Sequence, residues 1–530
     1  MANDFARRDF LKIAGLASAA LALPLASRAQ TSASLDLEEM TIGAMQDAMR
    51  DGRLTARSLA EAYLARIATI DKSVNSIIEL NPDALAIADA LDAERKAGHV
   101  RGPMHGIPIV IKDNIDTGDR MHTTAGSLAL AESIAARDAH VARRLREAGA
   151  VILGKTNLSE WANFRSTHST SGWSGRGGLT RNPYALDRNA CGSSSGTGAA
   201  ISANLAAVGV GTETDGSVVC PSSACGLVGL KPTLGLVSRT GIIPIAHSQD
   251  TAGPMARTVT DAAILLGAMT GIDSLDAITA ESRSHVQADY TKFLDANALR
   301  GARIGVARKF FGFNDQVDRV MKEAIDVIQR LGATLVDPAD IETTGKFDDS
   351  EFEVLLYEFK TDLNAYLAAL APSVKVRSLA DVIRFNEEHR DREMPYFGQE
   401  ILERAEKKGP LSSDEYKKAL AKNHLLSRKQ GIDAVIAKHK LDALIAPTGG
   451  PVWPTDLANG DHLTGGYSTA SAVAGYPHIT VPAGSVLGLP VGLSFFSGAW
   501  TEPKLLGYAF AFEQATKARK TPRFLPTITV

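Results

Sequence analysis

Two serine sites flanked by glycine lie close together in this sequence, at Ser193 and Ser217. Ser193 opens the serine run in residues 192–196 (GSSSG), and Ser217 closes residues 211–217 (GTETDGS). A serine hydroxyl becomes a nucleophile when a base removes its proton, and backbone N–H groups in tight glycine turns can stabilise an oxyanion. The stretch from Cys191 to Pro221 is therefore the candidate site of an acyl-transfer reaction.

Lys112 is the candidate base. It stands at the end of residues 107–111 (IPIVI), a β-branched run that predicts a short buried strand. A lysine at a strand end is usually a surface residue. If it is buried instead, desolvation lowers its pKa and leaves a neutral amine that can accept a proton. Position alone leaves both interpretations open.

Three interpretations of the serine sites compete. Residues 192–196 fit a nucleophile elbow with Ser194 at its centre, but an elbow follows an apolar strand, and residues 186–190 (LDRNA) are not one. Ser193 and Ser217 could instead be structural caps of helices. The third interpretation is a relay in which a desolvated lysine accepts a proton from one serine, which accepts a proton from the other.

Residues 149–156 (GAVILGKT) match the phosphate-loop pattern. In a true phosphate loop the residues between the glycines form a loop after the strand. Here the apolar residues between the glycines predict the strand itself. We therefore reject nucleotide binding.

The surrounding pattern is that of an α/β protein. Helical periodicity and caps predict helices at 83–97, 138–148 and 258–270, and a helix followed by a short strand between the two serine sites. After residue 275 the chain alternates, and 345–438 reads as a helical layer over one face of the sheet. The later elements expected are strands at 302–307, 333–337, 444–447, 479–482 and 491–496, and helices at 315–331, 467–475 and 503–516.

Size and charge exclude some functions. The chain has 530 residues, of which 45% are hydrophobic and 22% charged, and its net charge is −3 with no basic block. Such a chain buries a large core, and nothing in it indicates a nucleic-acid surface.

Residues 1–29 are typical of a twin-arginine export signal. Arg7 and Arg8 precede an apolar stretch at 13–26, and residues 27–29 (SRA) resemble a signal-peptidase site. A membrane anchor is the alternative, but the apolar stretch is short for a span. We therefore expect a periplasmic or secreted protein with no membrane attachment after cleavage, and a remaining domain over 30–530.

The chain has three cysteines, Cys191, Cys220 and Cys225. Their spacing is not that of a zinc site, and an odd number leaves at least one unpaired. Since twin-arginine export carries folded protein, we expect no structural disulfide. All three are predicted to be small packing residues.

Six motifs, in order along the chain, resemble those of the amidase signature family. They are residues 106–114 (GIPIVIKDN), 192–196, 211–217, 226–233 (GLVGLKPT), 474–477 (AGYP) and 488–493 (GLPVGL). The signature core would extend over about 106–260. The resemblance implies one large α/β/α domain with a central mixed twisted sheet covered by helices, and an amidase that needs no metal or organic cofactor.

The resemblance also implies roles for individual residues. Ser217 would be the nucleophile, Ser193 the bridging serine on a cis peptide bond, and Lys112 the base. Ser194 would hydrogen-bond within this relay. The oxyanion would be held by the N–H groups of Ser217 and of three residues before it, Thr214, Asp215 and Gly216.

The sequence departs from the usual family pattern at three positions. Glu213 stands where aspartate is usual, Asp215 where glycine is usual, and Val219 where arginine is usual, so an expected ion pair is missing. With residues 220–221 (CP) and 235–239 (GLVSR), these departures are most similar to the bacterial peptide amidases, which release ammonia from C-terminal peptide amides.

Other classes remain as alternatives: an amidotransferase-type subunit, an aryl or aliphatic acylamide amidase, or a silent binding protein on the same scaffold. The first would need partner chains and would be cytoplasmic, which the export signal argues against. Retention of Lys112, Ser193 and Ser217 argues against a silent protein. Partner chains are therefore not expected, and the substrate is a small-molecule or peptide amide. Loop length and aromatic content place the acyl pocket among 161–176, 352–359 and 449–468.

Overall fold

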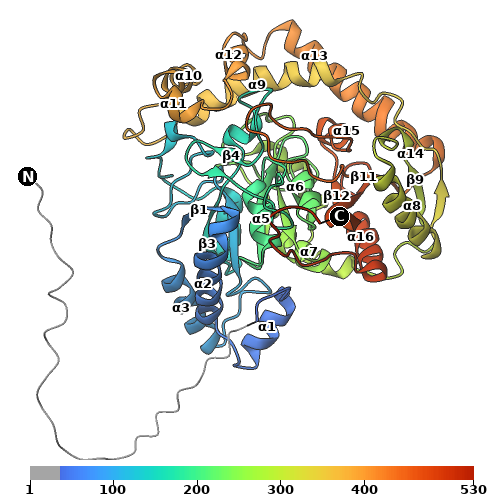
Figure 1. The fold of residues 1–530 in the computed structure, drawn as a ribbon, viewed down its shortest axis with the longest axis horizontal. Coiled ribbons are helices and arrows are strands. Elements are labelled where there is room, and N and C mark those ends of the chain that lie inside the picture. Colours follow the sequence, from blue (N-terminus) through green and yellow to red (C-terminus); the bar gives the residue numbers. More distant parts are fainter. Residues whose placement is uncertain (1–35, 530) are drawn as a thin grey trace, which may run out of the picture. The chain divides into compact units, whose positions relative to one another are not determined.

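An eleven-stranded mixed sheet organises the protein in the computed structural model, which describes residues 36–529 (Figure 1). The expected export signal at 1–29 lies outside the described residues. The strands of this sheet are β1 (Ile77–Leu80), β2 (Pro108–Lys112), β3 (Val151–Thr156), β6 (Val208–Glu213), β7 (Val228–Lys231), β8 (Thr251–Ala256), β9 (Arg303–Val306), β10 (Thr334–Val336), β11 (Ala443–Pro447), β12 (His478–Val486) and β13 (Leu489–Phe496). A separate pair is formed by β4 (Trp173–Ser174) and β5 (Gly178–Leu179).

The strand order is β1-β3-β2-β6-β8-β7-β12-β13-β11-β9-β10. Strands β3, β2 and β6 are mutually parallel, and so are β11, β9 and β10, while the pairs between these two groups are antiparallel. The expected α/β fold with a mixed sheet is confirmed. The parallel arrangement of β3, β2 and β6 matters for function because it places the ends of β2 and β6 side by side.

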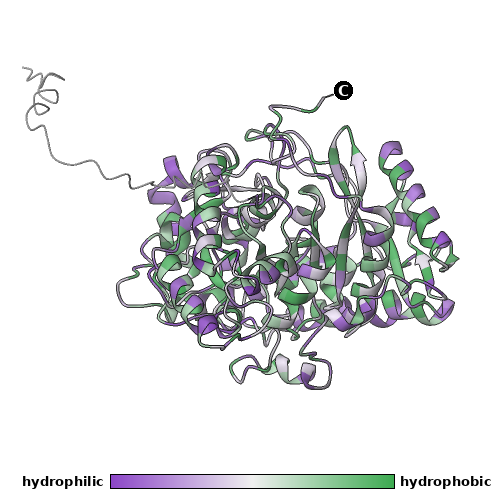
Figure 2. Ribbon diagram, turned by 90° about the horizontal axis from the view of Figure 1, so that it is seen from below, coloured by the Kyte–Doolittle hydropathy of each residue, from purple (hydrophilic) through white to green (hydrophobic). Residues whose placement is uncertain are grey.

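Helices pack around this sheet. They are α1 (Ile42–Arg50), α2 (Ala56–Val74), α3 (Ala84–Lys96), α4 (His140–Glu147), α5 (Ser195–Ser202), α6 (Val219–Ala224), α7 (Val259–Met269), α8 (Asp315–Arg330), α9 (Asp348–Ala368), α10 (Leu379–Glu388), α11 (Arg390–Glu393), α12 (Glu400–Glu406), α13 (Asp414–His424), α14 (Asp433–His439), α15 (Thr469–Ala474) and α16 (Glu502–Thr516). Their ribbons carry hydrophilic and hydrophobic stretches side by side, as expected of helices with one face on the core and one in water (Figure 2). Among residues 36–529, no helix is long and apolar enough to span a membrane.

Helix α5 connects the first serine site to β6, and every residue in it is buried. It consists largely of glycine, alanine and serine because the backbone of other segments lies close to this helix. A Cβ added to Gly196 would lie 2.4 Å from the carbonyl oxygens of Asn157 and Ser76. The small residues at this site therefore serve packing as well as chemistry. The predicted helix and strand between the serine sites are confirmed.

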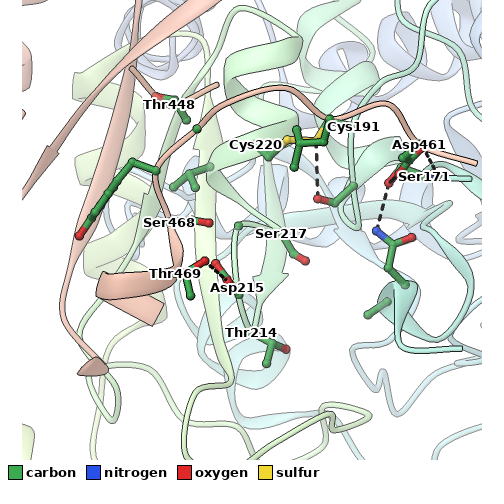
Figure 3. A pocket seen from close by; sticks show the side chains of 18 of the residues that line it. Ser171, Cys191, Thr214, Asp215, Ser217, Cys220, Thr448, Asp461, Ser468 and Thr469 are labelled. Carbon is green, nitrogen blue, oxygen red and sulfur yellow. Dashed lines mark hydrogen bonds between the residues drawn. A yellow bond between two sulfur atoms is a disulfide. The ribbon is translucent and has the colours of Figure 1, made fainter. Parts of the chain in front are cut away.

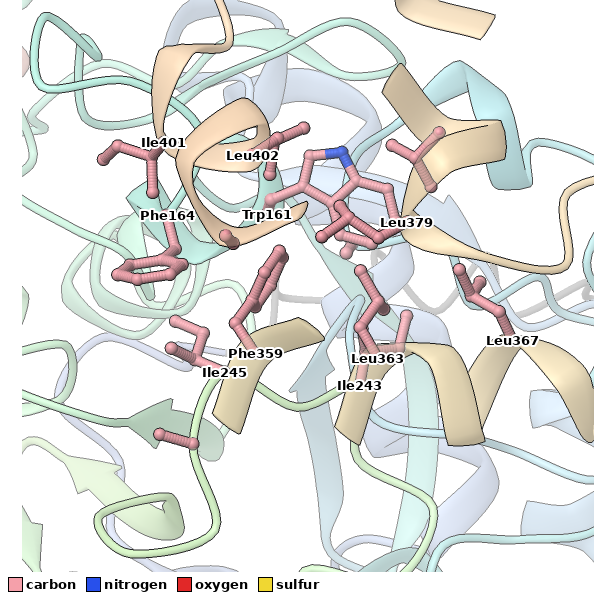
Figure 4. Packing of buried hydrophobic residues seen from close by; sticks show 14 of the residues in the cluster. Trp161, Phe164, Ile243, Ile245, Phe359, Leu363, Leu367, Leu379, Ile401 and Leu402 are labelled. Atoms are coloured by element: carbon pink, nitrogen blue, oxygen red, sulfur yellow. The ribbon is translucent and has the colours of Figure 1, made fainter. Parts of the chain in front are cut away.

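The expected helical layer is formed by α9 to α14, drawn in gold and orange in Figure 1. Its inner face contributes Phe359, Leu363 and Leu367 of α9 to a buried apolar cluster (Figure 4). The opposing side of that cluster includes Trp161 and Phe164, from the irregular segment before the serine region. The layer therefore holds this segment in place, and this segment forms part of the candidate site.

Candidate active site

Lys112 is completely buried at the end of β2, and its amine faces the serine region. Nζ lies 2.7 Å from Ser193 Oγ, 2.9 Å from Thr212 Oγ1 and 3.2 Å from the Thr212 carbonyl oxygen. A neutral amine has two hydrogens and one lone pair. It can donate both hydrogens to Thr212 and keep the lone pair for the Ser193 hydroxyl.

Burial is also the main influence on the pKa of Lys112. It lowers the pKa of this amine from its ordinary value of 10.5 to about 7, although the carboxylates of Glu213 and Asp250 act in the opposite direction. A lysine with such a pKa is substantially neutral at physiological pH. Of the two interpretations that the sequence left open, the structure shows a buried lysine with a lowered pKa and not a surface lysine.

The two serine turns meet at the end of this lysine. The Gly192–Ser193 peptide bond is cis, as the resemblance implies. The backbone N–H of Ser194 donates to the Ser217 carbonyl oxygen at 3.2 Å, which ties one turn to the other. Ser193 is fully buried, whereas Ser217 is 7% exposed and lines a pocket. The less deeply buried of the two serines is thus the one that the resemblance implies as nucleophile.

Ser194 has a different environment from the one a nucleophile needs. Its side chain is buried, and Oγ donates to the Thr212 carbonyl oxygen at 3.1 Å and accepts from the Thr212 N–H at 3.2 Å. The same carbonyl oxygen also accepts from Lys112 Nζ. Ser194 therefore supports the lysine through Thr212, and the elbow interpretation has no geometric basis.

Residues 214–217 form a loop between the end of β6 and α6. Gly216 has φ +77°, a left-handed conformation that favours glycine. Within residues 36–529, no protein acceptor is bound by the N–H groups of Asp215, Gly216 or Ser217. Thr214, the fourth residue of the expected oxyanion site, also lines the pocket. Successive free amides of this kind form a site for a developing negative charge.

Glu213 shows what replaces the ion pair expected from the family pattern. Its Oε2 accepts from the backbone N–H groups of Val218 and Val219, at 2.7 and 3.0 Å, and so anchors the start of α6 directly after Ser217. Burial raises the pKa of this carboxyl, and nearby Lys231 opposes that shift.

Asp215 points away from the nucleophile. Its Oδ2 accepts from Thr469 Oγ1 at 2.7 Å, and Figure 3 shows this carboxyl directed toward Thr469 while the Ser217 hydroxyl points the other way. Burial raises the pKa of Asp215. The carboxyl that replaces the usual glycine therefore links this loop to the first residue of α15 by a hydrogen bond.

The pocket in front of Ser217 has a volume of about 420 Å³. All three segments expected from the sequence contribute to it, and they are represented by Phe164, Leu355 and Trp453. Further lining comes from Ser171 and from Asp461, which face the pocket in Figure 3. A mostly apolar pocket with a few fixed polar groups suits a small organic acyl group.

The cysteine prediction is wrong for two of the three residues. Cys191 and Cys220 form a disulfide, with Cα atoms 6.0 Å apart, whereas Cys225 is free and buried as expected. The bond crosses from one serine turn to the other and lies in the pocket wall (Figure 3). Pairing depends on the approach of two turns that are distant in the sequence, and spacing alone does not reveal it.

Removing this disulfide is expected to lower both stability and turnover. The double variant Cys191→Ala/Cys220→Ala frees a loop that spans 29 residues, which corresponds to a stability loss of roughly 3.6 kcal/mol. Turnover should fall because the disulfide no longer holds the two serine turns together. Thermal unfolding and steady-state kinetics measure the two effects, and Cys225→Ala is the matched control. Unchanged melting temperature and kcat in the double variant would contradict the prediction.

Sequence reasoning missed Thr212 as a functional residue. It binds the lysine through its hydroxyl and carbonyl groups, and Asn114 Nδ2 donates to the same hydroxyl at 3.0 Å. The sequence signal for Thr212 was weak because it is one of several polar residues in the motif at 211–217. Only the pairing of β6 with β2 brings it to Lys112.

Comparison with known proteins agrees with this geometry. The sequence profile named Amidase matches residues 58–506. A probable amidase of Arabidopsis thaliana is 43% identical over 509 residues, which cover 94% of each chain. The native peptide amidase from Stenotrophomonas maltophilia is 48% identical with a TM-score of 0.88, and the match covers 92% of this chain and 99% of that one. A putative amidase of Arthroderma benhamiae is 40% identical, with 93% of this chain and 84% of that one covered. This chain therefore belongs to the amidase signature family and is a hydrolase of amide C–N bonds.

Proposed function

We propose that this protein releases ammonia from the C-terminal carboxamide of peptides, with Ser217 as nucleophile, Ser193 as bridging serine and Lys112 as base. The observation that carries this proposal is the completely buried Lys112 amine, 2.7 Å from Ser193 Oγ, behind a pocket that exposes Ser217. The peptide amidase relative, 48% identical over nearly its whole length, supports the peptide substrate.

Acylation begins with proton transfer. Neutral Lys112 takes the proton of Ser193 as Ser193 takes that of Ser217, and Ser217 Oγ attacks the carboxamide carbon. The structure shows the first of these hydrogen bonds. Among residues 36–529 it records none between the two hydroxyls, so that second transfer belongs to the proposal, and such contacts often tighten only when substrate binds.

The tetrahedral intermediate places its negative charge on the former carbonyl oxygen. The free N–H groups of residues 215–217 are the donors for it, and each donor contributes about 3 kcal/mol to lowering the barrier. Lys112 returns its proton through Ser193 to the leaving nitrogen, and ammonia departs as the C–N bond breaks. Water then attacks the acyl-enzyme by the same relay, which regenerates the Ser217 hydroxyl and releases the acid.

A parallel assay of ammonia release tests this function. Peptide amides, aryl amides and small aliphatic amides are supplied at equal concentration to the purified protein. The highest kcat/KM is expected for peptide amides. A higher kcat/KM for aryl amides or for small aliphatic amides would replace the peptide substrate by that class of amide.

The pH dependence follows from the base. Because only the neutral amine accepts a proton, kcat/KM should rise as pH increases through the Lys112 pKa of about 7 and level off above it. Glu213 raises that pKa, so Glu213→Gln should move the rising limb to lower pH while one side-chain oxygen still anchors α6. A pH–rate profile of both proteins measures the shift. A limb that stays in place would show that Glu213 does not influence the base.

We also propose export by the twin-arginine route. The support is the sequence alone: Arg7 and Arg8, the apolar stretch at 13–26 and the small residues at 27–29. Fractionation of cells that express the full chain, with Arg7→Lys/Arg8→Lys as control, distinguishes periplasmic from cytoplasmic protein.

A further inference from the structure

Asn163 lies on an unusual turn in the pocket wall. Trp161, Ala162 and Asn163 have φ values of 49°, 54° and 70°, so three consecutive non-glycine residues are left-handed. Such residues are costly for the backbone and persist only where the surroundings hold them. Here Trp161 is packed in the cluster beneath the helical layer, and a buried ion pair between Glu160 and Arg165 spans the turn. These contacts hold the turn in a conformation in which Asn163 lines the pocket.

A chain of hydrogen bonds determines which way the Asn163 amide faces. The Asp461 carboxyl accepts from Ser171 Oγ at 2.5 Å, so the hydroxyl hydrogen of Ser171 points to Asp461. The Ser171 oxygen is then an acceptor, and it lies 3.0 Å from Asn163 Nδ2. The nitrogen of the amide must therefore face Ser171, since an oxygen there would meet another acceptor.

This orientation leaves one N–H of Asn163 unused. The amide nitrogen carries two hydrogens, Ser171 takes one, and no second acceptor is present among the described residues. The nitrogen is close to the serine site, because a Cβ added to Gly192 would lie 3.1 Å from it. Asn163 Oδ1 is buried and has no donor within residues 36–529, so Ser171 alone holds the amide.

We propose that this N–H of Asn163 binds a second carbonyl oxygen of the substrate, that of the amide preceding the scissile carboxamide. The backbone N–H groups of residues 215–217 are reserved for the scissile carbonyl, so a further donor in the same pocket serves a different acceptor. Asn163 is then a specificity-determining residue that favours acylamino over plain acyl groups. This inference rests on the proposed peptide amide hydrolysis and names the group by which the peptide is recognised.

Two substrates that differ by one group test it. N-acetylphenylalaninamide carries the second carbonyl, and 3-phenylpropanamide lacks the whole acetylamino group. The measured quantity is the ratio of their kcat/KM values. In Asn163→Gly the turn can keep its left-handed conformation, but the donor is lost, so the ratio should fall roughly ten-fold, as for one lost hydrogen bond. Asn163→Asp, which offers only acceptors when ionised, should lower it at least as much.

Two serine variants complete the design. Ser171→Ala removes the acceptor that orients the amide, so the ratio should fall here too, by less than in Asn163→Gly. Ser169→Ala is the matched control: Ser169 lies in the same loop, and among residues 36–529 its hydroxyl donates only to the Ser166 carbonyl oxygen. Its ratio should equal that of the unaltered protein.

The possible results separate the inference from the function beneath it. A ratio that is unchanged in Asn163→Gly, or equal losses on both substrates, overturns the role of Asn163 while amide hydrolysis stands. If the unaltered protein hydrolyses neither compound, the proposed peptide amide function is wrong and the inference is overturned with it.

Discussion

Replacing Lys112 by alanine is expected to lower amide turnover by about 10³-fold while the protein stays folded, because the relay loses its proton acceptor. Lys112→Met is the better-packed version of this change. Methionine is unbranched and fills most of the same volume, and an apolar side chain carries no desolvation cost in this buried place. Ammonia release and circular dichroism measure activity and folding.

Lys155 provides a matched control for this prediction. It is also a completely buried lysine whose pKa is lowered by burial, and it lies on β3, the parallel neighbour of β2. Its register partner is Ile111 and not Lys112, so its side chain leaves the opposite face of the sheet, where it binds the Ile115 carbonyl oxygen and Thr123. Lys155→Met should lower thermal stability and leave the pH–rate profile in place. A near-normal rate in Lys112→Met would end the relay proposal.

Replacing Ser217 by alanine is expected to have the largest effect, a fall in kcat on the order of 10⁵- to 10⁶-fold, since no acyl-enzyme can form. The unaltered protein should form a covalent adduct with a serine-directed phosphonate, and Ser217→Ala should form none. Intact-mass spectrometry detects the added mass, and peptide mapping places it.

Ser194→Ala is the appropriate comparison for the nucleophile. The Ser194 hydroxyl is buried and bonded to the backbone of Thr212, so this variant should weaken the support of Lys112 and still accept the phosphonate at Ser217. An adduct mapped to Ser194 would instead establish the nucleophile elbow.

Most individual elements could be predicted because their signals are local. Thr55 caps α2 through a reciprocal bond with Ser58, and Thr258 caps α7 by accepting from the Asp261 N–H. Strand β3 occupies the apolar residues of the phosphate-loop pattern, which confirms that this match was accidental. Such features depend on side chains within a few residues of the backbone they stabilise.

Strand β8 shows where local reasoning fails. Its sequence, TAGPMA, contains a glycine and a proline, both of which argue against a central strand. It nevertheless lies between β6 and β7. The β7 ladder pairs only with Met255 and Ala256, so Pro254 falls beyond it, and a Cβ at Gly253 would lie 2.1 Å from the Leu230 carbonyl oxygen. The end of the β7 ladder therefore explains how the strand tolerates the proline, and the close approach of β7 explains the glycine.

The sequence by itself determined which residue types are available for catalysis: glycine-flanked serines and a lysine at a strand end. It also determined the order of motifs that identifies the family. The tertiary structure decided what surrounds them. It buries Lys112 against Thr212, pairs Cys191 with Cys220, and turns Asn163 toward the pocket. The reason is physical. Residue types and caps act over a few positions of chain, whereas desolvation, disulfide pairing and hydrogen-bond direction depend on groups that only the folded sheet brings together.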